Sequence, residues 1–168
     1  LWYRRQRQMC IRDREEAIVS GVTYNDKEVK FTLFGVPDQP GIAGTVFGSL
    51  SEIGTNVDMI VQNVSKESIT DISFTAPSEQ QKDVEDTLKN ISKQLNAKGY
   101  DVDENIARIS IIGAGMKSES GVASKMFKTL GDNKINISMI STSPIRVSCV
   151  ISNNDIENAL NVLHEEFI

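Results

Sequence analysis

The feature that most constrains the fold of this chain is an internal repeat. Shifting the sequence by 80 positions superposes residues 41–60, GIAGTVFGSLSEIGTNVDMI, on residues 121–140, GVASKMFKTLGDNKINISMI. A repeat of this kind in 168 residues predicts two similar small units rather than one large one. The identical pairs are Gly41/Gly121, Ala43/Ala123, Phe47/Phe127, Leu50/Leu130, Asn56/Asn136, Met59/Met139 and Ile60/Ile140.

Hydrophobic periodicity predicts the same order of elements in each copy, namely strand, helix, strand, strand and helix. This order begins a ferredoxin-like unit, in which two helices cover one face of a four-stranded antiparallel sheet. The predicted fold class is therefore α+β, with two ferredoxin-like βαββαβ units. The expected strands are residues 29–36, 56–65 and 70–76 in the first copy and 107–115, 136–143 and 145–151 in the second.

The two copies differ in their last strand. Residues 98–104, KGYDVDE, can close the first copy, whereas the second copy reaches the end of the sequence directly after its second helix. A β-rich segment at residues 17–25, AIVSGVTYN, precedes the first copy. The economical solution is that this N-terminal strand completes the sheet of the second unit. The expected domains are then residues 27–104 and residues 106–168, intertwined through that strand.

Positive charge is concentrated at the start of the chain. Residues 1–14, LWYRRQRQMCIRDR, contain five arginines and no lysine, whereas residues 15–168 contain two arginines and eleven lysines. Without this head the chain has 13 basic and 22 acidic residues, which argues against binding to a phosphate backbone. We interpret residues 1–14 as a foreign or disordered head, and a basic arm for nucleic acid is the alternative. No nucleic-acid partner is expected.

Several other classes of protein are excluded by what the sequence lacks. No apolar run approaches the roughly 18 residues of a membrane-spanning helix, and no signal-peptide pattern opens the chain, so we expect a cytoplasmic protein without a membrane partner. Cys10 and Cys149 form neither a CxxC pair nor a disulfide framework, and His164 is not part of an HExxH motif. We predict no catalytic residue, no metal site and no cofactor.

The loop GVPDQPGIA, residues 35–43, is the strongest binding signal in the sequence. Pro40 lies just before the first helix, which leaves the N–H groups of Gly41, Ile42 and Ala43 available to an anion. Asp38 lies beside them and can pair with an ammonium group. A free amino acid carries both charges on one carbon and would suit such a site. The alternative is a Pro-Gly turn in which Asp38 caps the helix.

Both copies together resemble the paired ACT domains of aspartate kinases. The resemblance rests on GVPDQPGIAGTVFGSLSEIGTNVDMIVQNVS and TDISFT in the first copy, and on SIIGAGMKSESGVASKMFKTL and INISMISTSPIRVSCVI in the second. It covers residues 15–168 and is closest to the C-terminal regulatory half, or a separate small regulatory subunit, of such a kinase. The kinase half of the family is absent, so we do not expect this chain to phosphorylate a substrate.

The resemblance implies feedback control. Lysine, threonine or both would bind between ACT domains, commonly across a homodimer, and bias an aspartokinase catalytic domain or subunit toward an inactive state. Asp38 would pair with the ligand ammonium, and Gln62 would contribute a side-chain amide. The effector-binding residues implied in this way are Asp38, Gly41, Ile42, Ala43, Gln62, Asn136 and Ile137. Alternatively, these residues are ordinary turn and edge-strand positions. The alternative function is a ferredoxin-like module that binds RNA or protein and no small molecule.

The repeat adds one inference that the resemblance does not supply. The shift of 80 places Ser118 where the first copy has Asp38, so the second copy lacks the carboxylate. We therefore expect the second loop to bind an amino acid weakly or to bind something else. Lys117 and Glu119 are the charged neighbours that a different geometry could recruit.

Overall fold

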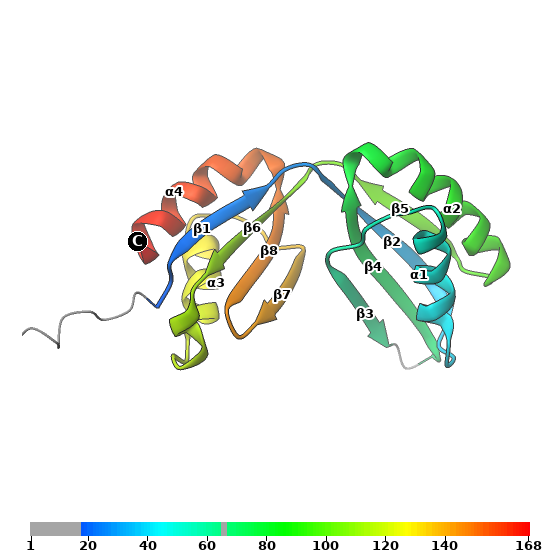
Figure 1. Cartoon of the computed structure of the whole chain (residues 1–168), viewed down its shortest axis with the longest axis horizontal. Helices are drawn as coiled ribbons and strands as arrows, with labels where there is room; N and C mark the ends of the chain where they lie inside the picture. Colours follow the sequence, from blue (N-terminus) through cyan, green and yellow to red (C-terminus); the bar gives the residue numbers. More distant parts are fainter. Residues whose placement is uncertain (1–17, 65–66) are drawn as a thin grey trace, which may run out of the picture.

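A computed structural model describes residues 18–64 and 67–168 of the chain. These residues form two four-stranded antiparallel sheets and four α-helices, arranged as two units that meet at one end like the arms of an arch (Figure 1). The predicted α+β class with two ferredoxin-like units is confirmed. The predicted head at residues 1–14 lies outside the described residues.

The first unit is built on a sheet with the strand order β3-β4-β2-β5. Every pairing in this sheet is antiparallel. A short 3₁₀ turn, Ser78–Gln80, leads from the sheet into the second helix. The elements are β2 (Glu28–Pro37), α1 (Ile42–Glu52), β3 (Ile60–Val64), β4 (Ile69–Pro77), α2 (Gln81–Gln94) and β5 (Gly99–Asp103).

The second unit has the equivalent order β1-β6-β8-β7. Its edge strand β1 pairs antiparallel with β6, with Gly21 opposite Ile112 and Asn25 opposite Arg108. The prediction that the N-terminal strand completes the second unit is thus confirmed. The elements are β1 (Gly21–Asn25), β6 (Ile106–Ile112), α3 (Val122–Asp132), β7 (Met139–Ser143), β8 (Arg146–Ser152) and α4 (Ile156–Phe167).

The second strand of each copy is shorter than the sequence predicts. The alternating pattern begins at residues 56 and 136, yet β3 starts at Ile60 and β7 at Met139. The residues before these strands approach the sheet through isolated bonds. The Ser138 N–H, for example, donates to the Val150 carbonyl at 2.8 Å. The alternation therefore extends into segments that contact the sheet without joining its ladder.

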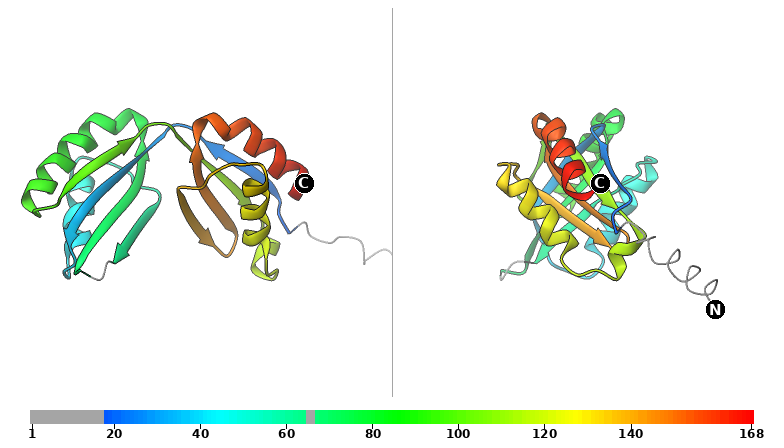
Figure 2. Two further views of the ribbon diagram at one scale, coloured as in Figure 1. Left: turned by 180° about the vertical axis from the view of Figure 1, so that it is seen from behind. Right: turned by 90° about the vertical axis from the view of Figure 1, so that its left-hand side faces the viewer.

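The chain crosses between the two units twice, because β1 precedes the first unit in sequence but belongs to the second sheet. The chain leaves β1 in the second sheet, passes through residues 26–27 and enters β2 in the first sheet. It returns from β5 through residues 104–105 into β6. Both crossovers lie side by side at the top of the arch, and two views show the helices on the outer sides of the molecule (Figures 1 and 2). A shift of 78 relates β1 to β5 and β2 to β6.

Each sheet buries alternate residues beneath its two helices, as expected for a strand with one covered face. In the first unit the Phe31 and Phe74 rings stack with their centroids 5.3 Å apart, and Phe47 of α1 meets Phe74 edge-on at 5.6 Å. In the second unit Ile109 and Cys149 fill the two equivalent sheet positions and are fully buried. Burial of each large side chain contributes about 1.5 to 3 kcal/mol to folding.

The faces of the sheets that carry no helix meet near the crossovers. Residues that pair across an antiparallel ladder point to the same side, so Ile106, Arg108 and Val150 lie on the face opposite the buried Ile109. A small apolar cluster fills this contact between the units. Its buried members are Met59, Ile106, Met139 and Val150.

Candidate functional site

The loop between β2 and α1 contains the first group of predicted effector residues. Gly41 precedes α1 with φ of 93°, a left-handed conformation that glycine adopts easily, and no side chain caps the helix. The alternative in which Asp38 caps this helix is therefore wrong. Asp38 is exposed, and its backbone N–H donates to the Ser68 carbonyl at 2.9 Å. Its carboxylate is thus displayed beside the helix start.

The backbone N–H groups of this loop are only partly free. The Ile42 N–H donates to the Gln39 carbonyl at 3.3 Å, which corrects the prediction that all three N–H groups are available. Gly41 and Ala43 have no backbone acceptor of this kind among the described residues. Two donors at the positive end of α1 therefore remain beside the Asp38 carboxylate. This pair of opposite charges matches the two charged groups of an amino acid.

Gln62 lies at the same end of the first sheet as this loop. It is exposed on the edge strand β3 and pairs with Ile72, which in turn pairs with Leu33 of β2. Beyond this pair β2 ends at Pro37 and β4 begins at Ile69, and these two residues pair with each other next to the loop. The structure thus brings Gln62 and the loop of Asp38 to one edge of one unit.

Asn136 and Ile137 lie in the other unit, at the crossover end. Asn136 is exposed and lines a cavity together with Asn105 and Ile106, whereas Ile137 packs against the second core. Asp38 follows the far end of β2, a strand of ten residues that begins beside the crossover and spans about 33 Å. Within one chain Asp38 and Asn136 are therefore far apart. A pocket that contains both residues would need two chains.

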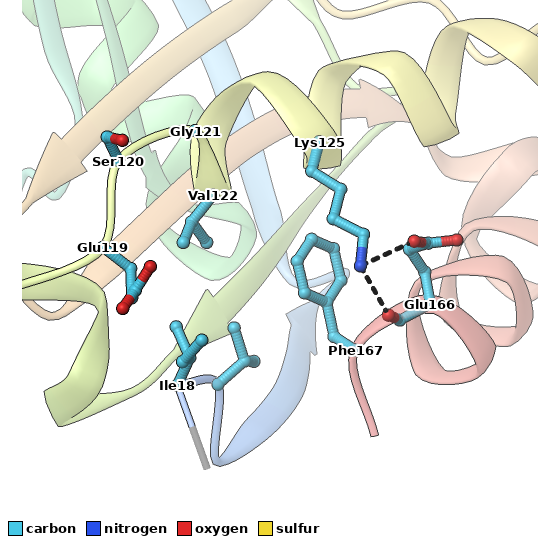
Figure 3. Close-up of a pocket in the computed structure, with 9 residues that line it drawn as sticks. Ile18, Glu119, Ser120, Gly121, Val122, Lys125, Glu166 and Phe167 are labelled. Carbon is cyan, nitrogen blue, oxygen red and sulfur yellow. Dashed lines mark hydrogen bonds and ion pairs between the residues drawn. The ribbon is translucent and has the colours of Figure 1, made fainter. Parts of the chain in front are cut away.

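The equivalent loop of the second unit is also exposed, but it borders a cavity formed with other parts of the chain. Gly121 repeats the left-handed geometry of the first loop, with φ of 91°. The start of α3 borders a cavity of about 360 Å³ together with Glu119, Lys125 and Phe167 (Figure 3). Lys125 is held there by an ion pair with Glu166, at 2.7 Å, and lies 5.2 Å from the centroid of the Phe167 ring.

Ser118 distinguishes the second loop from the first. The shift of 80 aligns it with Asp38, and its backbone N–H donates to the Gly115 carbonyl at 3.2 Å. Of the two charged neighbours named from the sequence, Glu119 lines the cavity at the start of α3, and Lys117 ends the 3₁₀ helix before it. The two helix starts share a left-handed glycine, whereas only the second loop contains a 3₁₀ helix and the charged groups of the two loops differ.

A cluster of charged side chains joins the units, and the sequence did not single it out. Arg108 of β6 places Nη2 2.8 Å from Oε1 of Glu28 on β2, and its Nη1 contacts Asp58 Oδ2. Asn25 donates to the same Glu28 oxygen at 2.8 Å. The available signal was that Arg108 is one of only two arginines in residues 15–168.

The environment of Glu28 disfavours its charged form. Burial raises the pKa of the Glu28 carboxyl, and the charge of Asp58 raises it further. The Arg108 guanidinium acts in the opposite direction, as do hydrogen bonds from the side chains of Asn25 and Thr75. Because desolvation is the largest of these effects, the net direction is upward.

Other chemistry finds no support among residues 18–64 and 67–168. They contain no group of three His, Cys, Asp or Glu side chains that could hold a metal ion. Burial raises the pKa of the Cys149 thiol to about 12, which makes it a poor nucleophile. None of the helices in the described part of the chain is long and apolar enough to cross a membrane.

Comparison with known proteins gives a consistent result. Models of the ACT domain match residues 31–96 and residues 109–167. The aspartate kinase of Pseudomonas fluorescens is 45% identical over 153 residues, which cover 91% of this chain and 37% of that protein. The chain therefore spans little more than a third of the length of the curated relatives it matches.

Two solved structures match the chain over nearly their whole length. The regulatory subunit of aspartate kinase from Thermus thermophilus, in its ligand-free form, is 34% identical with a TM-score of 0.85, and the match covers 90% of this chain and 99% of that one. A structure of aspartokinase alpha and beta subunits gives 38% identity and a TM-score of 0.84, with 89% and 98% coverage. This chain thus belongs to the aspartate kinase family, as a pair of its regulatory ACT domains.

Proposed function

We propose that this chain senses amino acids for an aspartate kinase. Lysine, threonine or both bind between ACT domains of two chains and thereby inhibit an aspartokinase catalytic domain or subunit. The proposed setting is the cytoplasm, as feedback control of the lysine and threonine pathways. The observation that carries the proposal is the exposed Asp38 carboxylate beside the open start of α1.

The charges at this loop suit the common part of an amino acid. The Asp38 carboxylate would pair with the ammonium group, and the N–H groups of Gly41 and Ala43 would bind the carboxylate. The third N–H, of Ile42, would have to weaken its bond to Gln39 to take part. Gln62, at the same edge, would contact the part of the ligand that differs between amino acids.

The proposal requires a homodimer, because Asn136 and Ile137 lie at the crossover end of the second unit, whereas Asp38 follows the opposite end of β2 in the first unit. Exposed apolar side chains on both edge strands support such an association. Ile60 of β3 is 52% exposed, and its equivalent Ile140 of β7 is 45% exposed. A second copy that covers these edges would bring the second unit of one chain toward the Asp38 loop of the other.

Isothermal titration of the purified chain with lysine, with threonine and with both tests the proposal. We expect saturable heat with at least one of them, and a shift toward the dimer in sedimentation velocity when that ligand is present. Leucine, which has no charged or hydroxyl group on its side chain, serves as the control ligand. Absence of heat with lysine, threonine and their mixture would contradict the proposal and favour a module that binds RNA or protein.

A further inference from the structure

The contact between the two units is built on a pseudo-twofold repeat, but its charges do not follow that symmetry. Pairing registers define the equivalent positions on the helix-free faces of the two sheets. At each of these positions the two units carry different side chains. Both carboxylates of the first unit are replaced by uncharged residues in the second, and the arginine of the second unit is a lysine in the first. The equivalent pairs are Arg108/Lys30, Glu28/Ile106 and Asp58/Ser138.

Arg108 connects the units through both arms of its guanidinium group. It stands on the second sheet and bonds two carboxylates of the first unit, Glu28 and Asp58. Only 12% of the Arg108 side chain and 6% of the Glu28 side chain are exposed, whereas Asp58 is half-exposed. A planar fork held by two carboxylates in a mostly buried site fixes orientation as well as distance.

The remaining contacts between the units constrain their angle less. The apolar cluster around Met59 and Met139 is small, and apolar contacts have no directional preference. Cavities flank this contact at equivalent positions, one of about 330 Å³ beside Asp58 and one of about 230 Å³ beside Ser138. The chain itself connects the units only through the two short crossovers among the described residues.

We propose that Arg108 is a positioning residue that fixes the angle between the two ACT units and thereby keeps the effector site complete. This inference rests on the proposed function, in which the Asp38 loop of one chain meets Asn136 and Ile137 of another. Because these groups belong to different units, the angle within each chain decides whether both halves of the site can meet. Lys30, the counterpart of Arg108, makes no ion pair among the described residues and provides a matched control.

Distances between spin labels on the outer helices test the angle directly and need no effector. The labels go on Asn90→Cys in α2 and Asn161→Cys in α4, both exposed, in a Cys10→Ser background diluted with unlabelled chain. The buried thiol of the remaining cysteine does not react. We expect a single narrow distance distribution that Arg108→Gln broadens or shifts. Lys30→Gln should leave this distribution unchanged.

Titration calorimetry then tests the link to the effector. We expect Arg108→Gln to weaken lysine or threonine binding by about 5- to 150-fold, the range of ordinary coupling between sites, and Lys30→Gln to have no effect. Arg108→Lys keeps the charge without the fork, so it should restore affinity only in part. If Arg108→Gln does not fold, Asp58→Asn replaces it, because this carboxylate is half-exposed and its loss leaves Glu28 paired.

The two measurements separate the possible failures. An unchanged distance distribution in Arg108→Gln would overturn the positioning role. A changed distribution with unchanged affinity would overturn its link to the effector. If the unmodified chain binds neither lysine nor threonine, the proposed function fails, while the distance distributions still decide whether Arg108 sets the angle.

Discussion

In the first ACT unit two stacked phenylalanines, Phe31 and Phe74, occupy the sheet positions that Ile109 and Cys149 occupy in the second. Strand order and helix placement are the same in both units. The two units therefore have the same fold but fill the space between sheet and helices with different side chains. Only the alternation of apolar residues has to be kept for the fold, and the sizes of the side chains can vary in compensation.

The loops at the helix starts differ more than the cores. The first loop displays the Asp38 carboxylate to solvent. The second has Ser118 there, and the Lys125–Glu166 ion pair stands beside its helix start. Two copies that began alike have thus kept their glycine geometry and diverged in charge. We therefore expect the two loops to differ in what they bind.

The largest effect in this comparison is expected in the cores. Phe74→Ala should lower the free energy of unfolding by about 3 to 5 kcal/mol, because it removes a fully buried ring that contacts two others. The equivalent change in the second unit, Cys149→Ala, removes a single sulfur atom and should cost about 1 kcal/mol. Urea denaturation followed by circular dichroism measures both. Equal losses would mean that the two cores carry equal shares of the stability.

The next effect concerns the loops and ligand binding. Asp38→Ala should weaken effector binding by about 2 to 4 kcal/mol, the range for removing one partner of a buried charge pair. It should change the free energy of unfolding by less than about 0.5 kcal/mol, because the exposed Asp38 side chain caps no helix. Titration calorimetry and urea denaturation give the two quantities. Ser118→Ala is the control and should leave effector affinity unchanged, so equal weakening by both variants would contradict a one-sided site.

Replacing the glycine at the helix start should destabilise the protein by the same amount in both units. Gly41 and Gly121 have φ values of 93° and 91°, and a Cβ at either position would meet no atom within 4 Å. Replacing either by alanine should therefore cost only the backbone strain, about 1 to 2 kcal/mol. Thermal denaturation of the two variants checks this symmetry. A clearly larger loss at one position would contradict the expectation that both helix starts depend on the same glycine conformation.

The repeat allowed much of this fold to be predicted. The shift that superposes Gly41 on Gly121 identified two units, and the absence of a closing strand in the second copy correctly assigned the segment before β2 to its sheet. Strand starts were less predictable, because alternation continues into residues such as Ser138, which bonds Val150 outside the regular ladder. Periodicity reports which side a residue faces and not whether its backbone pairs.

The contact between the units could not be predicted from the sequence. Arg108, Glu28 and Asp58 are separated from one another by 30 positions or more along the chain, and no short motif links them. They meet only because the two crossovers bring the starts of β2 and β6 together. Likewise, the sequence does not show that Asp38 and Asn136 lie far apart. That separation follows from the positions of the crossovers and the length of β2.

The last and smallest expected effect is a pH dependence that only the first copy can show, since Ile106 replaces Glu28 in the second. The folded-state pKa of Glu28 is raised above 4.5 by burial, although Arg108 opposes the shift and Lys27 lines the adjacent cavity. The folded protein therefore holds this proton more tightly than the unfolded chain does. The stabilising contribution is fully present below pH 4.5 and is lost as the pH rises through the raised pKa.

Glu28→Gln removes this titration while keeping a side chain of the same size. The free energy of unfolding of the unmodified chain, minus that of Glu28→Gln, should therefore fall as the pH rises from 4.5 through the raised pKa and stay constant above it. Urea denaturation of both proteins at a series of pH values gives the difference. A difference that rises with pH would show that Arg108, rather than burial, dominates the environment of Glu28, and that the contact between the units is a net stabilising ion pair.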